Sequence, residues 1–199
     1  MDTHSQTSDT PHSRHAFEGH LRECYGRVVY SHKTHEKCCD LLLAKWSRIK
    51  VWQIILSAGT TAGFLSVVFG SGTAGAMIGA AVSTTLLALN AYTKNYDLGE
   101  LAQKHKQAAN TLWVIREKFL ALITDLVMGE KPIEKLQEER DALNKQLGAA
   151  YASAPSTNSD AYKKAQEALK VKEDLTFSDA EIDAFLPKEL RRTTPPTSS

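Results

Sequence analysis

The sequence lacks charge over a stretch where its composition would place about ten charged residues. Residues 51–93 contain no Asp, Glu, Lys, Arg or His, although charged residues make up 24% of the chain. Forty-three residues without charge, bounded by Lys50 and Lys94, are rare in a soluble protein. This gap is the strongest signal in the sequence.

Other absences narrow the class of protein. A net charge of +1 leaves no basic field to attract nucleic acid, so no direct nucleic-acid binding is expected. Three cysteines, of which Cys38 and Cys39 are adjacent, are too few for a disulfide framework and favour a reducing compartment. The first 20 residues contain no apolar run, so a cleaved secretory signal is not expected. Membrane targeting would have to come from within the chain.

The uncharged stretch has the length of a membrane hairpin. A hydrocarbon layer about 30 Å thick needs around 20 helical residues, so 43 residues fit two spans and a tight turn. Gly70 to Thr73 form the natural break, which gives spans over 51–69 and 74–93. We therefore expect an all-α integral membrane protein whose two-helix transmembrane hairpin extends into cytoplasmic helices.

The flanks of the hairpin predict its topology. Lysine and arginine lie on both sides of the stretch and none lies in the turn, so the positive-inside rule places both termini in the cytoplasm of a multi-pass protein. Amphipathic rings and lysines that would anchor the hairpin at the headgroup layer are Trp46, Trp52, Tyr92, Tyr96, Lys50 and Lys94. The main alternative is a hairpin buried in a soluble helical bundle, which the polar remainder of the chain is poorly suited to enclose.

Small residues recur at helical spacing within both predicted spans. The candidates for helix packing or pore lining are Gly59, Gly63, Gly75, Gly79, Ser83 and Asn90. These faces could be satisfied by packing against each other within one hairpin. Alternatively, they could meet neighbouring chains in a homo-oligomer and line a wetted path, which one chain with two spans cannot enclose.

The remaining chain predicts cytoplasmic helices. The expected organisation is a disordered N-terminus (1–12), a core (13–129), a helical C-terminal region (130–191) and a disordered tail (192–199). The core consists of a pre-membrane helix (13–50), the hairpin (51–93) and a post-membrane helix (94–129). Helical stretches are expected over 132–148 and about 160–173, with a loop at 155–159. Ser178 and Glu181 predict a capping box that opens a short helix.

Signals for catalysis or metal binding are weak. His32, His35 and Cys39 could share one helix face, but a second set of ligands is lacking, so we expect a packing role and no metal. The chain has no phosphate-binding glycine loop after a strand and no G-x-S-x-G motif. Neither an enzyme nor a cofactor is therefore expected.

The order of these parts resembles a known family. The segments HKTHEKCCDLLLAKWSRIKVWQ, LNAYTKNYDLGELAQKHKQAANTLWVIREKFLALITDL and FSDAEIDAFLPKELR, together with the uncharged hairpin, resemble the SLATT family over about residues 13–192. These are bacterial two-transmembrane effector domains associated with SMODS nucleotidyltransferases, SLOG sensors and other antiviral partners. The resemblance lies in the architecture and in several segments together, because no single motif is diagnostic.

The resemblance implies a function in antiphage defence. A separately encoded sensor, such as a nucleotidyltransferase, a SLOG protein or a reverse transcriptase, would signal infection. The chain would then oligomerise in the bacterial inner membrane and form a pore or otherwise disrupt the lipid bilayer, which causes growth arrest or cell death by abortive infection. A membrane-anchored scaffold that holds a partner enzyme, or a soluble bundle that binds an apolar ligand, remain alternatives.

Overall fold

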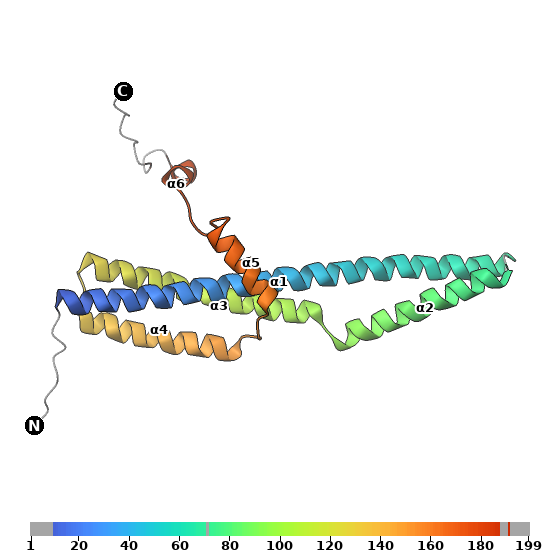
Figure 1. The fold of residues 1–199 in the computed structure, drawn as a ribbon, viewed down its shortest axis with the longest axis horizontal. Helices are drawn as coiled ribbons and strands as arrows, with labels where there is room; N and C mark the ends of the chain where they lie inside the picture. The colour runs from blue at the N-terminus through green and yellow to red at the C-terminus, as the bar shows by residue number, and fades with distance from the viewer. Residues whose placement is uncertain (1–9, 71, 188–190, 192–199) are drawn as a thin grey trace, which may run out of the picture.

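The computed structural model describes residues 10–70, 72–187 and 191 of the chain, and the regular structure within these ranges is helical (Figure 1). The helices in chain order are α1 (Pro11–Val68), α2 (Gly72–Asn95), α3 (Leu98–Met128), α4 (Ile133–Ser153), α5 (Ser159–Lys170) and α6 (Asp179–Phe185).

One helix, α1, runs through most of the length of the molecule (Figure 1). It contains 58 residues, which corresponds to about 87 Å at the usual helical rise. Thr10 caps its start through a reciprocal capping box with Ser13, and Pro11 occupies the first turn, where its missing N–H costs nothing. No proline interrupts the helix between residues 12 and 68, so the amphipathic segment and the first uncharged segment form one rigid element.

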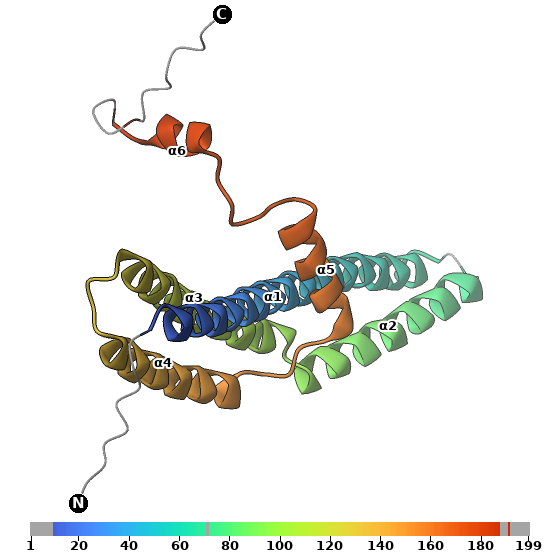
Figure 2. The ribbon, with the colours of Figure 1, turned by 60° about the vertical axis from the view of Figure 1, so that its left-hand side comes forward.

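The second helix turns back beside the end of α1. Gly70 adopts φ +88° in the connection, a conformation that favours glycine. The two antiparallel helices project from the rest of the molecule as a narrow arm, defined here as residues 51–68 of α1 together with α2 (Figures 1 and 2). Asp97 follows the arm and caps the start of α3, because its side chain accepts a hydrogen bond from the backbone N–H of Glu100 at 2.8 Å.

The hydrophobic core lies beside the other half of α1. We call this part the body: residues 11–50 of α1 with α3, α4 and α5. Leu21 of α1, Phe119 of α3 and Leu136 of α4 are completely buried together. Helix α3 ends at Gly129, which adopts the left-handed conformation (φ +75°) that commonly terminates helices. The first half of α1 and α3, the helix after the arm, therefore pair.

The C-terminal helices pack progressively less. Helix α5 crosses α1 and buries three alanines, Ala161, Ala165 and Ala168, against the body (Figure 2). Helix α6 begins with the predicted capping box between Ser178 and Glu181, which the structure confirms. No residue of α6 is buried.

Several helix ends differ from the sequence-based expectations. Helix α1 already begins at Pro11, inside the tail expected over 1–12, because the Thr10 cap is a local signal that the apolar periodicity does not reveal. Helix α4 continues to Ser153, because Ala149, Ala150 and Tyr151 extend it past Gly148, the expected end. Residues 1–9 and 192–199, expected to be tails, lie outside the described residues.

The apolar content of the arm is clearest in its second helix. Within the described residues, one segment, Thr73–Met128, which covers α2 and α3, meets the length and composition of a membrane span. Its apolar 18-residue window has no buried residue. That both helices of the arm span a membrane as a hairpin remains a prediction.

Candidate functional site

Two glycines bring the helices of the arm into backbone contact. A Cβ atom at Gly63 would lie 2.9 Å from the Cα atom of Gly79 and 3.7 Å from the carbonyl oxygen of Gly75. Gly59 has more space, since the nearest atom to its Cβ position is Cγ1 of Val82 at 3.5 Å. A side chain at residue 63 would therefore force the two helices apart.

The contact between the helices follows a regular spacing, which we call the seam. It consists of the half-buried residues Ile49, Gln53, Leu56, Thr60 and Gly63 of α1 and Gly75, Gly79, Val82, Leu86, Leu89 and Thr93 of α2. Steps of three and four residues keep one face of each helix toward its partner. Ser83 and Asn90 are exposed, so the seam proceeds from Gly79 through Val82 rather than through Ser83.

Five hydroxyl groups of the arm donate hydrogen bonds within their own helices. Thr60 donates to the carbonyl oxygen of Leu56 at 2.9 Å, and Thr84 donates to that of Ala80 at 2.9 Å. Ser57, Thr61 and Thr85 make the same bond to the residue four positions earlier. Because these bonds need no water, the hydroxyl groups are compatible with an apolar environment.

Polar side chains join the two helices of the arm where it meets the body, a region that we call the base (residues 45–53 of α1 and 90–96). Nε2 of Gln53 donates to Oδ1 of Asn90 at 2.8 Å and to Oγ1 of Thr93 at 3.3 Å. Nζ of Lys45 donates to the hydroxyl of Tyr92 at 3.0 Å. The predicted candidate Asn90 thus joins the two helices by a side-chain hydrogen bond.

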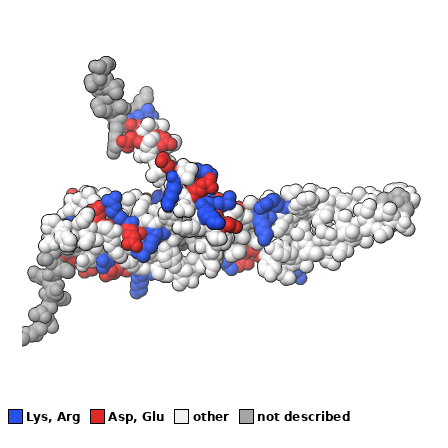
Figure 3. Space-filling model, in the orientation of Figure 1, with Lys and Arg blue, Asp and Glu red and all other residues white. Residues whose placement is uncertain are grey.

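Aromatic rings and lysines surround this base. Trp46, Trp52, Tyr92 and Tyr96 are 36–62% exposed, and the rings of Tyr92 and Tyr96 stack with centroids 5.1 Å apart. Nζ of Lys50 lies 5.6 Å from the ring of Trp46. Lys94 is exposed at the end of α2. Figure 3 shows blue Lys and Arg side chains at the base, while the arm beyond them is uncharged on the visible face.

A buried histidine pair joins α1 to α3 below the base. Nδ1 of His35 and Nδ1 of His105 are 2.9 Å apart, so one ring must donate its proton to the other. Burial, with the neighbouring His105 and His32, lowers the pKa of His35 to about 4, and burial also lowers the pKa of His105. The pair is therefore neutral at physiological pH.

A third histidine extends this cluster toward the solvent side of α3. His32 lies against Trp113 with ring centroids 5.4 Å apart, and the guanidinium of Arg116 lies 3.8 Å from the same tryptophan ring. Nδ1 of His32 and Nη1 of Arg116 are buried without a hydrogen-bond partner among the described residues, which is costly. Sequence spacing grouped His32 with His35 and Cys39. The partners on α3 could be found only from the pairing of the helices.

The structure places His35 with His105 rather than with the cysteines. Burial raises the pKa of the thiols of Cys38 and Cys39, so both stay protonated. Among the residues that the structure describes, no group of three or more His, Cys, Asp or Glu side chains is positioned to hold a metal ion.

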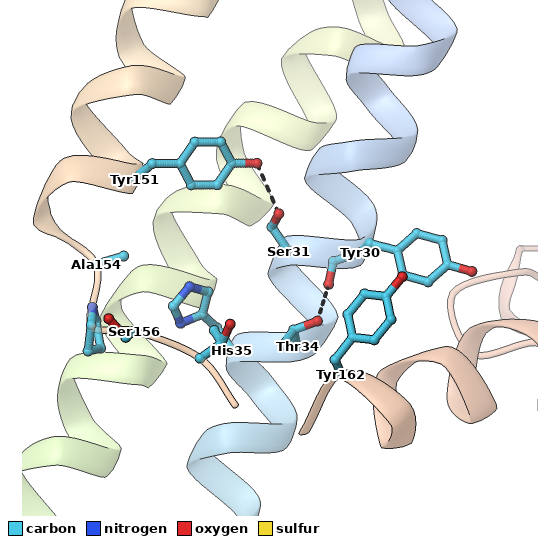
Figure 4. Close-up of a pocket in the computed structure, with 10 residues that line it drawn as sticks. Tyr30, Ser31, Thr34, His35, Tyr151, Ala154, Ser156 and Tyr162 are labelled. Carbon is cyan, nitrogen blue, oxygen red and sulfur yellow. Dashed lines mark hydrogen bonds between the residues drawn. The ribbon is translucent and has the colours of Figure 1, made fainter. Parts of the chain in front are cut away.

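A pocket of about 350 Å³ lies where the α4–α5 connection passes α1 (Figure 4). Tyr30 and Tyr162 stack at one side with centroids 6.1 Å apart, and Ser31 and Tyr151 share a hydrogen bond of 2.9 Å at the other. Its lining carries hydroxyl groups, rings and His35, but no carboxylate, lysine or arginine from the described part of the chain.

Comparison with known families gives a match over most of the chain. The model of the SMODS and SLOG-associating 2TM effector domain family 4 matches residues 17–181, which include the arm, its base and most of the body. The chain belongs to this family. Comparison with curated proteins and with solved structures gives no significant match.

Membership confirms the resemblance expected from the sequence. The family is one of effector domains that associate with SMODS and SLOG proteins, and its description specifies two transmembrane segments. Two uncharged helices joined by a turn are the part of this SLATT chain that corresponds to such a description. The arm and its base are therefore the candidate functional site.

The glycine contact of the arm predicts a strong effect of added side chains. Gly63→Ile should lower the free energy of unfolding in detergent micelles by about 1–3 kcal/mol, because its Cβ atom would overlap the backbone of α2. Thermal unfolding followed by circular dichroism measures the change. Ala58→Ile, on the exposed side of the same helix, is the matched control and should have little effect. Equal losses for both variants would contradict the packing role of Gly63.

The histidine pair predicts that the body loses stability in mild acid. Because folding lowers the pKa of His35 to about 4 from an ordinary value near 6.5, the folded state prefers neutral histidine. The contribution of neutral His35 to the free energy of unfolding is complete above pH 6.5. As the pH falls toward 4 this contribution is lost, which lowers the free energy of unfolding by about 2–3 kcal/mol. Denaturant unfolding at several pH values tests this. His35→Leu with His105→Leu should flatten the dependence, leaving a part from His32, whereas His15→Gln at an exposed position should not.

Proposed function

We propose that this chain is a membrane effector of a bacterial antiphage defence system. In this proposal the arm spans the inner membrane with both termini in the cytoplasm. On a signal from a partner sensor, several copies assemble and form a pore or otherwise disrupt the bilayer, which stops growth or kills the cell. The observation that carries the proposal is that residues 51–93, nearly all of the arm, contain no charged side chain and expose large apolar side chains around the outside. Hydroxyl groups such as those of Thr60 and Thr84 bond within their own helices.

The dimensions of the arm suit a bilayer. Its 18 residues of α1 extend about 27 Å and the 24 residues of α2 extend about 36 Å, against a hydrocarbon thickness of about 30 Å. Side chains around the arm such as Ile54, Phe64, Met77 and Leu87 are 68–74% exposed. In water, so large an apolar surface would be unfavourable, whereas lipid would solvate it.

The base of the arm suits the headgroup layer. A cavity of about 460 Å³ there is lined by Trp46, Tyr96, Lys50 and Lys94 among others. Lysine beside amphipathic rings is the combination that favours the membrane interface. These residues are all on the side of the body, which supports a topology with the body and both termini in the cytoplasm.

The family association supports a partner outside this chain. Family members associate with SMODS and SLOG proteins, and we propose that a separately encoded protein of this kind, or a reverse transcriptase, supplies the trigger. The body offers the surface on which such a signal would act. In this scheme the chain has no catalytic step of its own and binds neither a cofactor nor nucleic acid.

A pore would require several copies. The inner faces of the two helices pack against each other in the seam, so one chain leaves no channel between them. The outer face retains small polar side chains, namely Ser57, Thr61, Ser83 and Thr84, which are exposed. In an assembly these side chains could face a wetted path between neighbouring arms. The rival proposal is a scaffold in which the arm only anchors the body and leaves the membrane intact.

Membrane insertion predicts the accessibility of the tip of the arm. The three native cysteines are buried, so Thr73→Cys introduces one exposed thiol near the tip. In intact spheroplasts this thiol should react with a membrane-impermeant maleimide, whereas Lys104→Cys in the body should react only after lysis. The protein should also resist carbonate extraction. Labelling of Thr73→Cys only from the cytoplasmic side, or release by carbonate, would contradict the proposed topology.

Effector activity predicts leakage through reconstituted bilayers. Liposomes that contain the chain with its partner system should release a small entrapped dye. Gly75→Leu with Gly79→Leu should reduce release about tenfold or more because the seam would open, while Ala76→Leu with Ala80→Leu, at neighbouring exposed positions, should retain more of it. Bilayers that stay intact with the triggered wild-type chain would favour the scaffold instead.

A further inference from the structure

The outer face of α3 carries an apolar stripe that nothing in the described chain covers. Five large side chains on it, Trp113, Val114, Leu120, Val127 and Met128, are 40–70% exposed, and Ala121 is exposed between them. They form two rows in which residues recur every seven positions, 113, 120 and 127 beside 114, 121 and 128. We call these six residues the α3 stripe. It extends over about 24 Å of helix.

The stripe is confined to one half of the helix. On the same face, the first half of α3 exposes Gln103, Lys106, Gln107 and Asn110. Trp113 lies 15 residues beyond Leu98, about 22 Å from the start of the helix beside the arm. Since α3 runs away from the arm (Figure 1), a bilayer around the arm would not reach the stripe. Lipid is therefore not its partner.

We propose that the α3 stripe docks against the α3 stripe of a second copy of this chain, with the two helices parallel. The inference rests on the proposed function, because chains inserted in one membrane with the same topology hold their α3 helices parallel and at the same depth. Each residue then meets its own counterpart. A repeat of seven residues keeps such a contact aligned along two helices that wind gently around each other.

Charge within the stripe is compatible with contact between identical surfaces. Glu117 lies between the two rows, and it would face its own copy. Its Oε1 atom already accepts hydrogen bonds from Nη2 of Arg116 at 2.6 Å and from Nε at 3.0 Å, so its charge is paired within the chain. Thr124 donates to the carbonyl oxygen of Leu120 at 2.9 Å. The contact therefore brings no unpaired like charges of the described residues together.

Cysteine cross-linking in membranes tests the proposal. Cys24, Cys38 and Cys39 are buried and free, so a single new cysteine on the surface dominates the reaction. We expect Leu120→Cys and Val127→Cys to form disulfide-linked dimers on mild oxidation with copper phenanthroline, followed by N-ethylmaleimide before denaturation. Thr111→Cys is exposed on the same helix but lies to the side of the stripe, and should give about fivefold less dimer. The unsubstituted chain supplies the background.

Specific outcomes would overturn the proposal. Monomeric Leu120→Cys and Val127→Cys, or equal dimer from Thr111→Cys, would exclude a parallel contact through the stripe. A disulfide between Trp113→Cys and Val127→Cys in mixed samples, without same-residue dimers at 113 or 127, would show an antiparallel contact and equally contradict it.

A variant without cysteine provides an independent measurement. Leu120→Glu with Val127→Glu should shift the mass of the chain in nanodiscs toward the monomer, whereas Thr111→Glu should not. An unchanged mass would contradict the proposal. Failure of the proposed function is separable, because it is measured by carbonate extraction and by leakage: a chain that dimerises through the stripe but never permeabilises liposomes would keep this inference and lose the effector role.

Discussion

The continuity of α1 is the constraint on which the rest of the structure depends. A single helix carries both the face that buries Leu21 and Val28 in the body and the face that meets α2 at Gly63. Because a helix of this length bends little without a proline or an inserted side chain, the arm cannot move independently of the body's long axis. Helices α3 and α5 both pack on the same helix that forms half of the arm.

Polar contacts join α1 to α3 and to the connection after α5. The histidine pair joins α1 to α3, and Lys33 bridges to Asp174 at 2.9 Å and to Glu36 at 3.2 Å, which fixes the connection after α5 onto α1. These contacts are specific in geometry but contribute modestly to stability. The carboxylates that pair with the buried Lys33 remain partly exposed, and the histidine cluster leaves two buried atoms without partners among the described residues. The apolar core holds the body together, whereas the polar joint fixes how α1, α3 and α5 align.

The arm and the body follow opposite solvation rules. In the body a cluster of apolar side chains faces inward, and the visible face carries patches of charge of both signs (Figure 3). In the arm the glycines Gly63 and Gly79 face inward, where they allow the backbones to approach, and large apolar residues such as Phe64, Met77 and Leu87 face outward. This inversion is expected where the surrounding medium is lipid and the helices associate by close packing rather than by exclusion of water. Helix α1 belongs to both parts, and near Lys50 its sequence changes from a segment with charged residues to one without them.

The sequence by itself determined the helical class, the extent of the uncharged segment, the turn near Gly70, the glycine stop at residue 129 and the capping box at Ser178, because these depend on local composition and backbone preference. It also carried enough of the family pattern to be recognised. Only the tertiary structure decided that the seam passes through Val82 instead of Ser83 and that Gln53 bonds Asn90. It also decided that His35 pairs with His105 and that the α3 stripe is left uncovered. The physical reason is the rotation of each helix about its own axis. Small differences in helical twist accumulate along a long helix and, with the register in which two helices pack, decide which side chains meet. The periodicity of the sequence alone does not fix that register.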